Sequence, residues 1–187
     1  MYDASNLKKG LKIQIDNEPY IITDFEFSKP GKGQAIYKVR MKNMLTGYNI
    51  DRSYRSNDKF QPADLMSKKM EYLYCDGSNY CFMDPETYEN HLADENVIGD
   101  KKNFLLENTT VDVLFFGEKI IEITLPLVVK LKVTKSDPGV RGDTATNVTK
   151  PATLETGYTV QVPLFIEEGE YIKVDTRTGE YVERAKD

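Results

Sequence analysis

Short segments in which apolar and polar residues alternate follow one another along this chain, with turn residues between them. Alternation with a period of two is typical of half-buried β-strands, and strands at short, regular spacing are typical of sandwiches and barrels. Helical periodicity is weak and is confined to residues 62–66, 85–93 and 101–108. The sequence therefore predicts an all-β fold. The clearest strand segments are MEYLYC, NYCFMD, TVDVLFFG, KIIEITL, VVKLKVTKS, YTVQVPLFI and YIKVDTRTGEYVE.

Two prolines lie where this pattern changes. Pro62 ends a basic segment, and Pro126 separates two strongly apolar stretches and cannot donate a ladder hydrogen bond. Division at these points gives three pieces of ~60 residues, each with enough strands for a small closed or nearly closed barrel. We therefore expect domains at residues 1–63, 64–126 and 127–187. Such small barrels bury little core, so contacts between neighbours would help to stabilise an elongated molecule.

Composition excludes several classes of protein. Of the 187 residues, 29% are charged and 40% are hydrophobic, which suits a soluble globular protein rather than a disordered one. The N-terminal MYDASNLKKGLKI lacks the apolar core of a signal peptide, and no apolar stretch approaches membrane-spanning length. We therefore expect a cytoplasmic protein without membrane contact.

Charge is distributed unevenly. The net charge of −5 argues against a protein that coats nucleic acid by bulk electrostatics. Residues 1–64 carry 11 Lys and Arg against 8 Asp and Glu (+3), residues 65–127 carry 5 against 12 (−7), and residues 128–187 carry 9 against 10 (−1). A basic first third could dock against phosphate while the acidic middle is repelled, although chance variation among solvated faces explains the same numbers equally well.

No motif for catalysis or metal binding is recognisable. Cys75 and Cys81 flank the turn residues DGSNY, so we expect two half-buried thiols near each other across a hairpin in a reducing compartment. His91 is the one histidine, too few for a four-ligand metal site with these cysteines, and we interpret it as a surface residue. No carboxylate pair, Ser/His/Asp set or dinucleotide fingerprint has a persuasive spacing, so we expect no catalytic residue and no metal.

The stretch FEFSKPGKGQAIYKVRMK, residues 25–42, predicts a hairpin with a lysine at its tip. Pro30, Gly31, Lys32 and Gly33 separate two alternating runs, and we expect the glycines to supply positive φ. A phosphate-binding loop is excluded because Gly33, rather than Ser or Thr, follows the lysine, and a strand follows in place of a helix. Lys32 is therefore either a solvated cation or one that is presented to a partner.

A second polar loop, RGDTATN at residues 141–147, is dense in small hydrogen-bonding side chains. Such a loop suits contacts with RNA backbone and base edges. An ordinary surface loop that bonds its own backbone is the alternative.

Four segments of the chain resemble the bacterial elongation factor P family: LKKGLKIQIDNEPYIITDFEFSKPGKGQA, its tip KPGKGQA, GDTATNVTKPATLETGYTVQVPLFIEEG and IKVDTRTGEYVER. The tip alone would be unspecific, but both motifs in one chain at this separation are highly specific. The resemblance covers essentially the whole chain. It implies an SH3-like (KOW-like) N-terminal barrel with a modified-lysine loop, followed by two OB-folds, in an elongated, L-shaped arrangement similar to tRNA.

The function implied by this resemblance is that of a translation factor and not of an enzyme. Members of the family bind the 70S ribosome between the peptidyl and exit sites and stimulate peptide-bond formation at consecutive prolines. The implied partners are the ribosome, the peptidyl-site tRNA, ribosomal RNA and lysine-modifying enzymes. We expect a monomer without a cofactor. Two alternatives stay open: an elongation factor P-like paralogue without the proline role, and a general OB-fold module that binds single-stranded nucleic acid.

Specific residues match the family's motifs. Lys32 resembles the lysine that is extended after translation and reaches the CCA end of the peptidyl-tRNA, in a loop shaped by Pro30, Gly31 and Gly33. The loop is most similar to the branch that carries (R)-β-lysine; a branch with 5-aminopentanol also uses lysine, whereas the rhamnosylated branch has arginine.

Further matches lie near the C-terminus. Gly142, Asp143 and Thr144 match the family's GDT element, which lies near the exit-site codon on the small subunit. Tyr181 and Arg184 match positions implicated in contacts with tRNA or ribosomal RNA.

Overall fold

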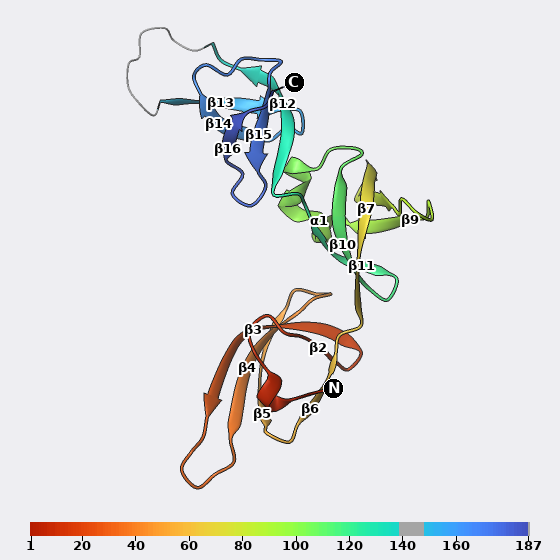
Figure 1. Cartoon of the computed structure of the whole chain (residues 1–187), viewed down its shortest axis with the longest axis vertical. Coiled ribbons are helices and arrows are strands. Elements are labelled where there is room, and N and C mark those ends of the chain that lie inside the picture. Colours follow the sequence, from red (N-terminus) through yellow and green to blue (C-terminus); the bar gives the residue numbers. More distant parts are fainter. Residues whose placement is uncertain (139–147, 187) are drawn as a thin grey trace. The chain divides into compact units, whose positions relative to one another are not determined.

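The computed structural model describes residues 1–138 and 148–186, and strands dominate both ranges. The strands form three sheets, and each sheet is built from a continuous stretch of the chain (Figure 1). The predicted all-β class is confirmed. The chain packs as two compact units, residues 1–67 with 114–121, and residues 68–113 with 122–187.

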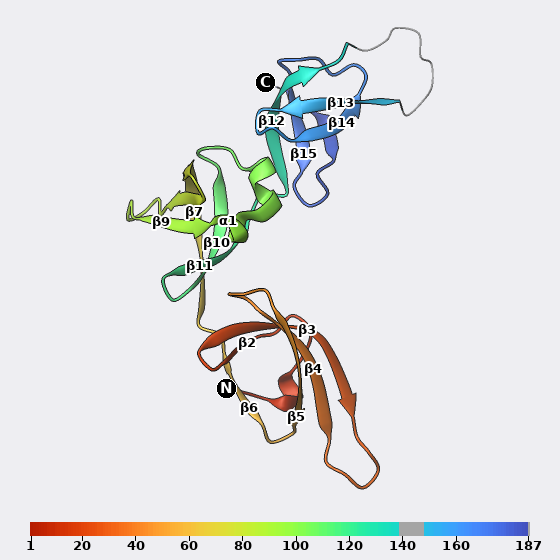
Figure 2. The same ribbon diagram turned by 180° about the vertical axis from the view of Figure 1, so that it is seen from behind.

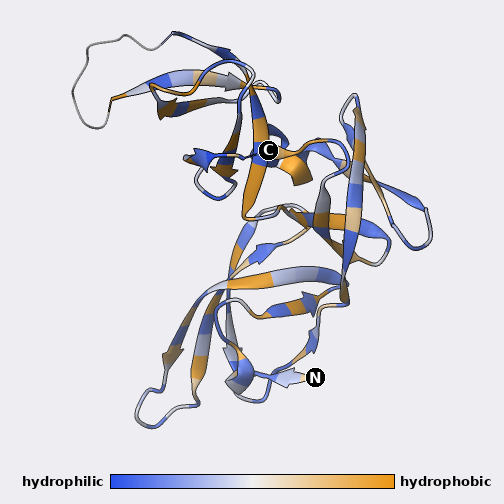
Figure 3. Cartoon of the chain, turned by 45° about the horizontal axis from the view of Figure 1, so that its top comes forward, coloured by the Kyte–Doolittle hydropathy of each residue, from blue (hydrophilic) through white to orange (hydrophobic). Residues whose placement is uncertain are grey.

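The first sheet has six strands in the order β1-β6-β2-β3-β4-β5. Ile13, Ile22, Val39 and Met41 point into its core and are almost fully buried. Polar residues alternate with them, so the strands change colour from residue to residue in Figure 3. The elements are β1 (Tyr2–Asp3), the 3-10 turn η1 (Ala4–Asn6), β2 (Lys12–Ile15), β3 (Glu18–Ser28), β4 (Ile36–Asn43), β5 (Asn49–Arg55) and β6 (Lys59–Pro62).

The second sheet has five strands in the order β11-β10-β7-β8-β9. Phe82 on β8 is fully buried, and Tyr72 on β7 packs against it with ring centroids 5.5 Å apart. A short helical segment follows β9, and the carboxylate of Asp94 caps its first turn. The elements are β7 (Leu65–Asp76), β8 (Asn79–Met83), β9 (Asn90–Asp94), α1 (Glu95–Ile98), the 3-10 segment η2 (Gly99–Phe104), β10 (Thr110–Phe116) and β11 (Lys119–Thr124).

The third sheet also has five strands, in the order β14-β13-β12-β15-β16. Leu131, Val133, Leu154 and Ile172 form its buried side. The hairpin expected at Thr178 and Gly179 is confirmed between the last two strands. The elements are β12 (Val128–Ser136), β13 (Thr149–Leu154), β14 (Thr159–Pro163), β15 (Tyr171–Asp175) and β16 (Tyr181–Arg184).

Two helical expectations are wrong. Residues 62–66 lie in β6, a short connection and the start of β7, and residues 85–93 form a turn and most of β9. Both segments are short and hold few apolar residues, so their period does not separate helix from strand. His91, which the sequence places on the surface, consequently lies on a strand and is half-buried.

The two cysteines lie on the β7–β8 hairpin, as expected, but not as two half-buried thiols. Cys75 pairs with Tyr80, and Cys81 pairs with Tyr74, so neighbouring positions place the two side chains on opposite faces of the sheet. Cys75 is exposed and Cys81 is buried, and both are free.

Candidate functional site

The predicted hairpin at residues 25–42 is present, and its tip is a loop of exposed residues. Strand pairing continues to Ser28 on β3 and Ile36 on β4. The two-stranded ribbon of β3 and β4 extends beyond the β5–β6 turn and ends in this loop, as both views show (Figures 1 and 2). Within the loop the N–H of Gly33 donates to the carbonyl of Pro30 at 2.9 Å. The loop is thus a tight turn that is carried by two hydrogen-bonded strands.

The glycines of this loop do not supply the positive φ that was expected from the sequence. Neither Gly31 nor Gly33 has a positive φ. A Cβ on Gly33 would lie 3.1 Å from Cγ of Pro30, whereas a Cβ on Gly31 would meet no atom within 4 Å. Gly33 therefore allows the close approach of the proline ring, and Gly31 leaves the space before Lys32 empty.

Lys32 projects from this loop and is exposed. Within residues 1–138 and 148–186, it makes no hydrogen bond or ion pair. A lysine side chain extends ~6 Å from Cα to its ammonium group. The ammonium group is therefore available to an external acceptor or to a modifying enzyme.

An aromatic cluster packs across β3 and β4 next to the loop. The ring of Tyr37 lies between Phe25 and Phe27, at centroid distances of 5.8 and 5.1 Å. Phe27 is nevertheless 51% exposed. Cross-strand contacts between aromatic rings stabilise strand pairing, so the cluster supports β3 and β4 up to the base of the Lys32 loop.

Arg55 lies beside the loop as well and is not among the residues predicted from the sequence. Arg55 pairs with Ile36 across β4 and β5, and it helps to line a hollow of about 410 Å³ together with Pro30, Gly33 and Gln34. The position of Arg55 depends on the register of β5, which the sequence does not indicate. A second cation therefore lies at the base of the Lys32 loop.

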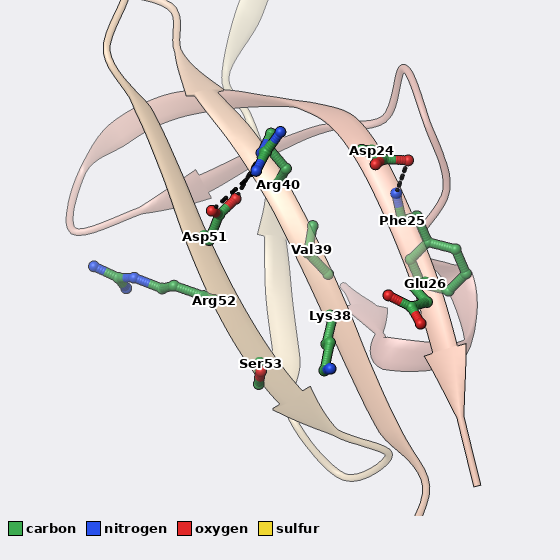
Figure 4. Close-up of a pocket in the computed structure, with 9 residues that line it drawn as sticks. All are labelled: Asp24, Phe25, Glu26, Lys38, Val39, Arg40, Asp51, Arg52 and Ser53. Atoms are coloured by element: carbon green, nitrogen blue, oxygen red, sulfur yellow. Dashed lines mark hydrogen bonds and ion pairs between the residues drawn. The ribbon is translucent and has the colours of Figure 1, made fainter.

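A groove of about 320 Å³ crosses the outer face of β3, β4 and β5 (Figure 4). Asp24, Arg40 and Asp51 form one cross-strand row, and Arg40 donates to Asp51 at 2.8 and 3.3 Å. The guanidinium of Arg40 holds the pKa of Asp51 below its ordinary value. Because acids and bases alternate here, the groove has no excess charge for an anion, and we interpret it as a solvated face.

The C-terminal residues divide into two groups. Gly142, Asp143 and Thr144 lie outside the described residues. Tyr181 begins β16, and burial raises the pKa of its hydroxyl. Arg184 ends the same strand and is exposed.

Three contacts orient the guanidinium of Arg184. It pairs with Glu170 at 2.9 Å, donates to the carbonyl of Phe165 at 3.3 Å and lies 5.1 Å from the centre of the Phe165 ring. The side chain remains about half exposed. Part of the guanidinium is therefore presented to solvent in a defined orientation.

The described residues contain no group of three or more His, Cys, Asp or Glu side chains that could hold a metal ion. In the same part of the chain, no helix is both long and apolar enough to cross a membrane.

Three family models match the chain in succession. They are the KOW-like domain of elongation factor P at residues 3–60, its OB domain at residues 65–123 and its C-terminal domain at residues 129–184. The three matched ranges correspond to the three sheets.

Complete proteins match as well. Elongation factor P 2 of Geobacter sulfurreducens is 54% identical over 186 residues, and the elongation factor P of Desulfosudis oleivorans is 55% identical over 186 residues; each match covers 100% of both chains. Among solved structures, the eukaryotic translation initiation factor 5A from Methanococcus jannaschii has a TM-score of 0.56 at 24% identity and covers 66% of this chain and 92% of its own. That likeness concerns the fold alone.

Proposed function

Because the chain belongs to the elongation factor P family and is a translation factor rather than an enzyme, we propose that it binds the ribosome between the peptidyl and exit sites and stimulates peptide-bond formation at consecutive prolines. Lys32, extended after translation, is the residue that steadies the CCA end of the peptidyl-tRNA. The observation that carries the proposal is the exposed, unpaired ammonium group of Lys32 at the tip of a paired ribbon, within the described residues.

The physical basis is positioning. The secondary amine and rigid ring of proline hinder attack, so a loosely held peptidyl donor reacts slowly. Holding the donor in place removes orientational freedom before the reaction, and such positioning contributes several kcal/mol in well-oriented systems. The ribosome forms the bond, and the factor supplies only the orientation.

The loop is suited to a long, flexible cation. Addition of an (R)-β-lysyl group to Lys32 would roughly double its ~6 Å reach and add donors for phosphate and ribose oxygens. Lys32 is exposed, and no atom lies within 4 Å of the place of a Cβ on Gly31, which favours approach of a modifying enzyme to the amine. Intact-mass analysis of the protein from its native host distinguishes an (R)-β-lysyl group from 5-aminopentanol and from an unmodified chain.

The C-terminal domain supplies the remaining ribosome contacts in this proposal. The half-exposed guanidinium of Arg184, oriented by Glu170 and Phe165, suits a phosphate of tRNA or ribosomal RNA. Tyr181 lies on the same strand. Gly142, Asp143 and Thr144 complete the contact at the exit-site codon.

The test compares Lys32→Ala with Lys29→Ala in a strain that lacks the factor. Both lysines are exposed in the same loop, so the pair separates the specific amine from general charge. Lys32→Ala should abolish synthesis through a triple-proline reporter without lowering the thermal unfolding midpoint, and Lys29→Ala should retain most of it. Undiminished synthesis by Lys32→Ala contradicts the proposal. Ribosome co-sedimentation distinguishes it from a general single-strand binder.

A further inference from the structure

Three hairpin turns in this chain share one hydrogen-bond pattern. They are Asn43–Tyr48 between β4 and β5, Asp84–Glu89 between β8 and β9, and Asp175–Glu180 between β15 and β16. In each turn the carbonyl of the first residue accepts the N–H of the fifth at 2.8 Å, and its side-chain oxygen accepts the N–H of the third at 2.8 Å. A threonine at the fourth position accepts the N–H of the sixth at 3.3 Å.

The fifth position of this turn is left-handed in all three copies. Two copies have glycine there, Gly47 with φ +79° and Gly179 with φ +74°, but the middle copy has Tyr88 with φ +61°. A bulky residue in this region is strained, whereas glycine is not. The side chain of Tyr88 is 74% exposed, so little packing offsets the strain. The presence of a tyrosine at this position is therefore better explained by a contact with a partner than by a contribution to folding.

The turn that carries Tyr88 is held firmly. The buried carboxylate of Asp84 accepts the N–H of Glu86 at 2.8 Å and pairs with Lys68 at 3.3 Å. These bonds lower the pKa of Asp84, so the carboxylate remains ionised at neutral pH. The ring of Tyr88 is thus presented from a defined backbone, flanked by the exposed residues Glu86 and Glu89.

The sheet face next to this turn is acidic around an apolar centre. Residues paired across strands share a face, so Tyr74, Cys81 and Leu92 form one row across β7, β8 and β9. Tyr74 is 47% exposed and Leu92 is 59% exposed. The flanking rows on this face contribute Asp76 and Asp94 on one side and Glu71 on the other, and no Lys or Arg occupies the paired positions of these rows.

We propose that Tyr88, with Glu86, Glu89 and the row of Tyr74 and Leu92 that begins one row further along the sheet, is a docking site for a protein segment rich in arginine and lysine. A guanidinium group can stack on the Tyr88 ring while the flanking carboxylates accept its hydrogen bonds. The same carboxylates repel phosphate, so the surface disfavours RNA. This contact is separate from the Lys32 loop and lies on a different sheet.

The first test asks whether the ring serves folding. Asparagine tolerates the left-handed region, so Tyr88→Asn relieves the strain and removes the ring. Its thermal unfolding midpoint should equal or exceed that of the wild type. A clearly lower midpoint shows that Tyr88 is held for stability and overturns the proposal.

The second test measures binding of the full-length protein to a fluorescent decapeptide of alternating arginine and glycine, and to single-stranded decauridylate. Tyr88→Asn should lower the affinity for the peptide about two- to fivefold, which is the range for an exposed cation–aromatic contact. Tyr48→Asn is the matched control, because Tyr48 is 76% exposed at the end of the equivalent turn between β4 and β5, and this change should leave the affinity for the peptide unchanged. The proposal is overturned if wild type and Tyr88→Asn bind the peptide with equal affinity. It is also overturned if the substitution lowers the affinity for decauridylate and not that for the peptide.

Discussion

Replacement of Gly179 by alanine tests whether the last hairpin turn requires glycine both for its backbone conformation and for its contact with Tyr158. Gly179 has φ +74° and lies under the side chain of Tyr158. A Cβ at this position would be 2.5 Å from the hydroxyl oxygen of Tyr158 and 3.5 Å from the ring of Phe104. Tyr158 must therefore move. It would lose its 3.3 Å hydrogen bond to the carbonyl of Gly179 and its edge-on contact with Phe104, whose centroid is 5.0 Å away.

The expected cost has two parts. The left-handed backbone costs an alanine about 1 kcal/mol net, because the strain exceeds the entropy that alanine removes from the unfolded chain. Loss of the hydrogen bond and of the aromatic pair adds about 1–3 kcal/mol. We therefore expect Gly179→Ala to lower the free energy of unfolding by about 2–4 kcal/mol.

Gly157→Ala is the control on the same sheet. Gly157 has φ +89°, but a Cβ there would meet no atom within 4 Å, so only the backbone part of about 1 kcal/mol applies. Hydrogen exchange of the amides in β12 and β15 gives the free energy of opening of this sheet, so the losses in the two variants can be compared in the same cooperative unit. Equal losses for the two variants would refute the contact explanation, because they would show that Tyr158 yields without cost.

Three further predictions concern single side chains. Phe82→Ala leaves a cavity in the second sheet and should cost about 3–5 kcal/mol of unfolding free energy in urea titrations, since Phe82 is fully buried. Hydrogen bonds from Arg177 lower the pKa of Asp175 to about 2; its ionised form therefore stabilises the folded state above about pH 4, and this contribution is lost as the pH falls from about 4 to 2. Unfolding of Asp175→Asn should show a smaller pH dependence in that window, and an unchanged slope would contradict the assignment. Arg184→Ala should change the unfolding free energy by less than about 1 kcal/mol, because its pair with Glu170 is partly exposed; a larger loss in urea titrations would show a structural role in place of the proposed RNA contact.

The β-strands were predictable because their pattern has a period that no other element shares. The ribbon from β3 to β4 and the hairpin at Gly179 follow from alternation around turn residues, and both are present. The wrong helices at 62–66 and 85–93 came from segments that hold too few apolar residues to define a period. Sequence patterns report on local conformation, and they fail where pairing between distant segments decides the structure.

The candidate site was predictable only in part, for the same reason. The exposed position of Lys32 follows from its neighbours in the sequence. The role of Gly33 does not, because the proline contact that requires it depends on how the loop closes. Arg55 was missed because strand register alone brings it to the loop, and the strain at Tyr88 was missed because threonine followed by tyrosine carries no turn signal.

The loop between Ser28 and Ile36 contributes no residue to the buried core of the first sheet. Apart from Gly33, which the Pro30 ring requires, substitutions in this loop remove no core contact, so the side chain at the tip is constrained by its chemistry rather than by packing. A lineage could exchange the reactive side chain, or the enzyme that decorates it, while it inherits the same scaffold unaltered.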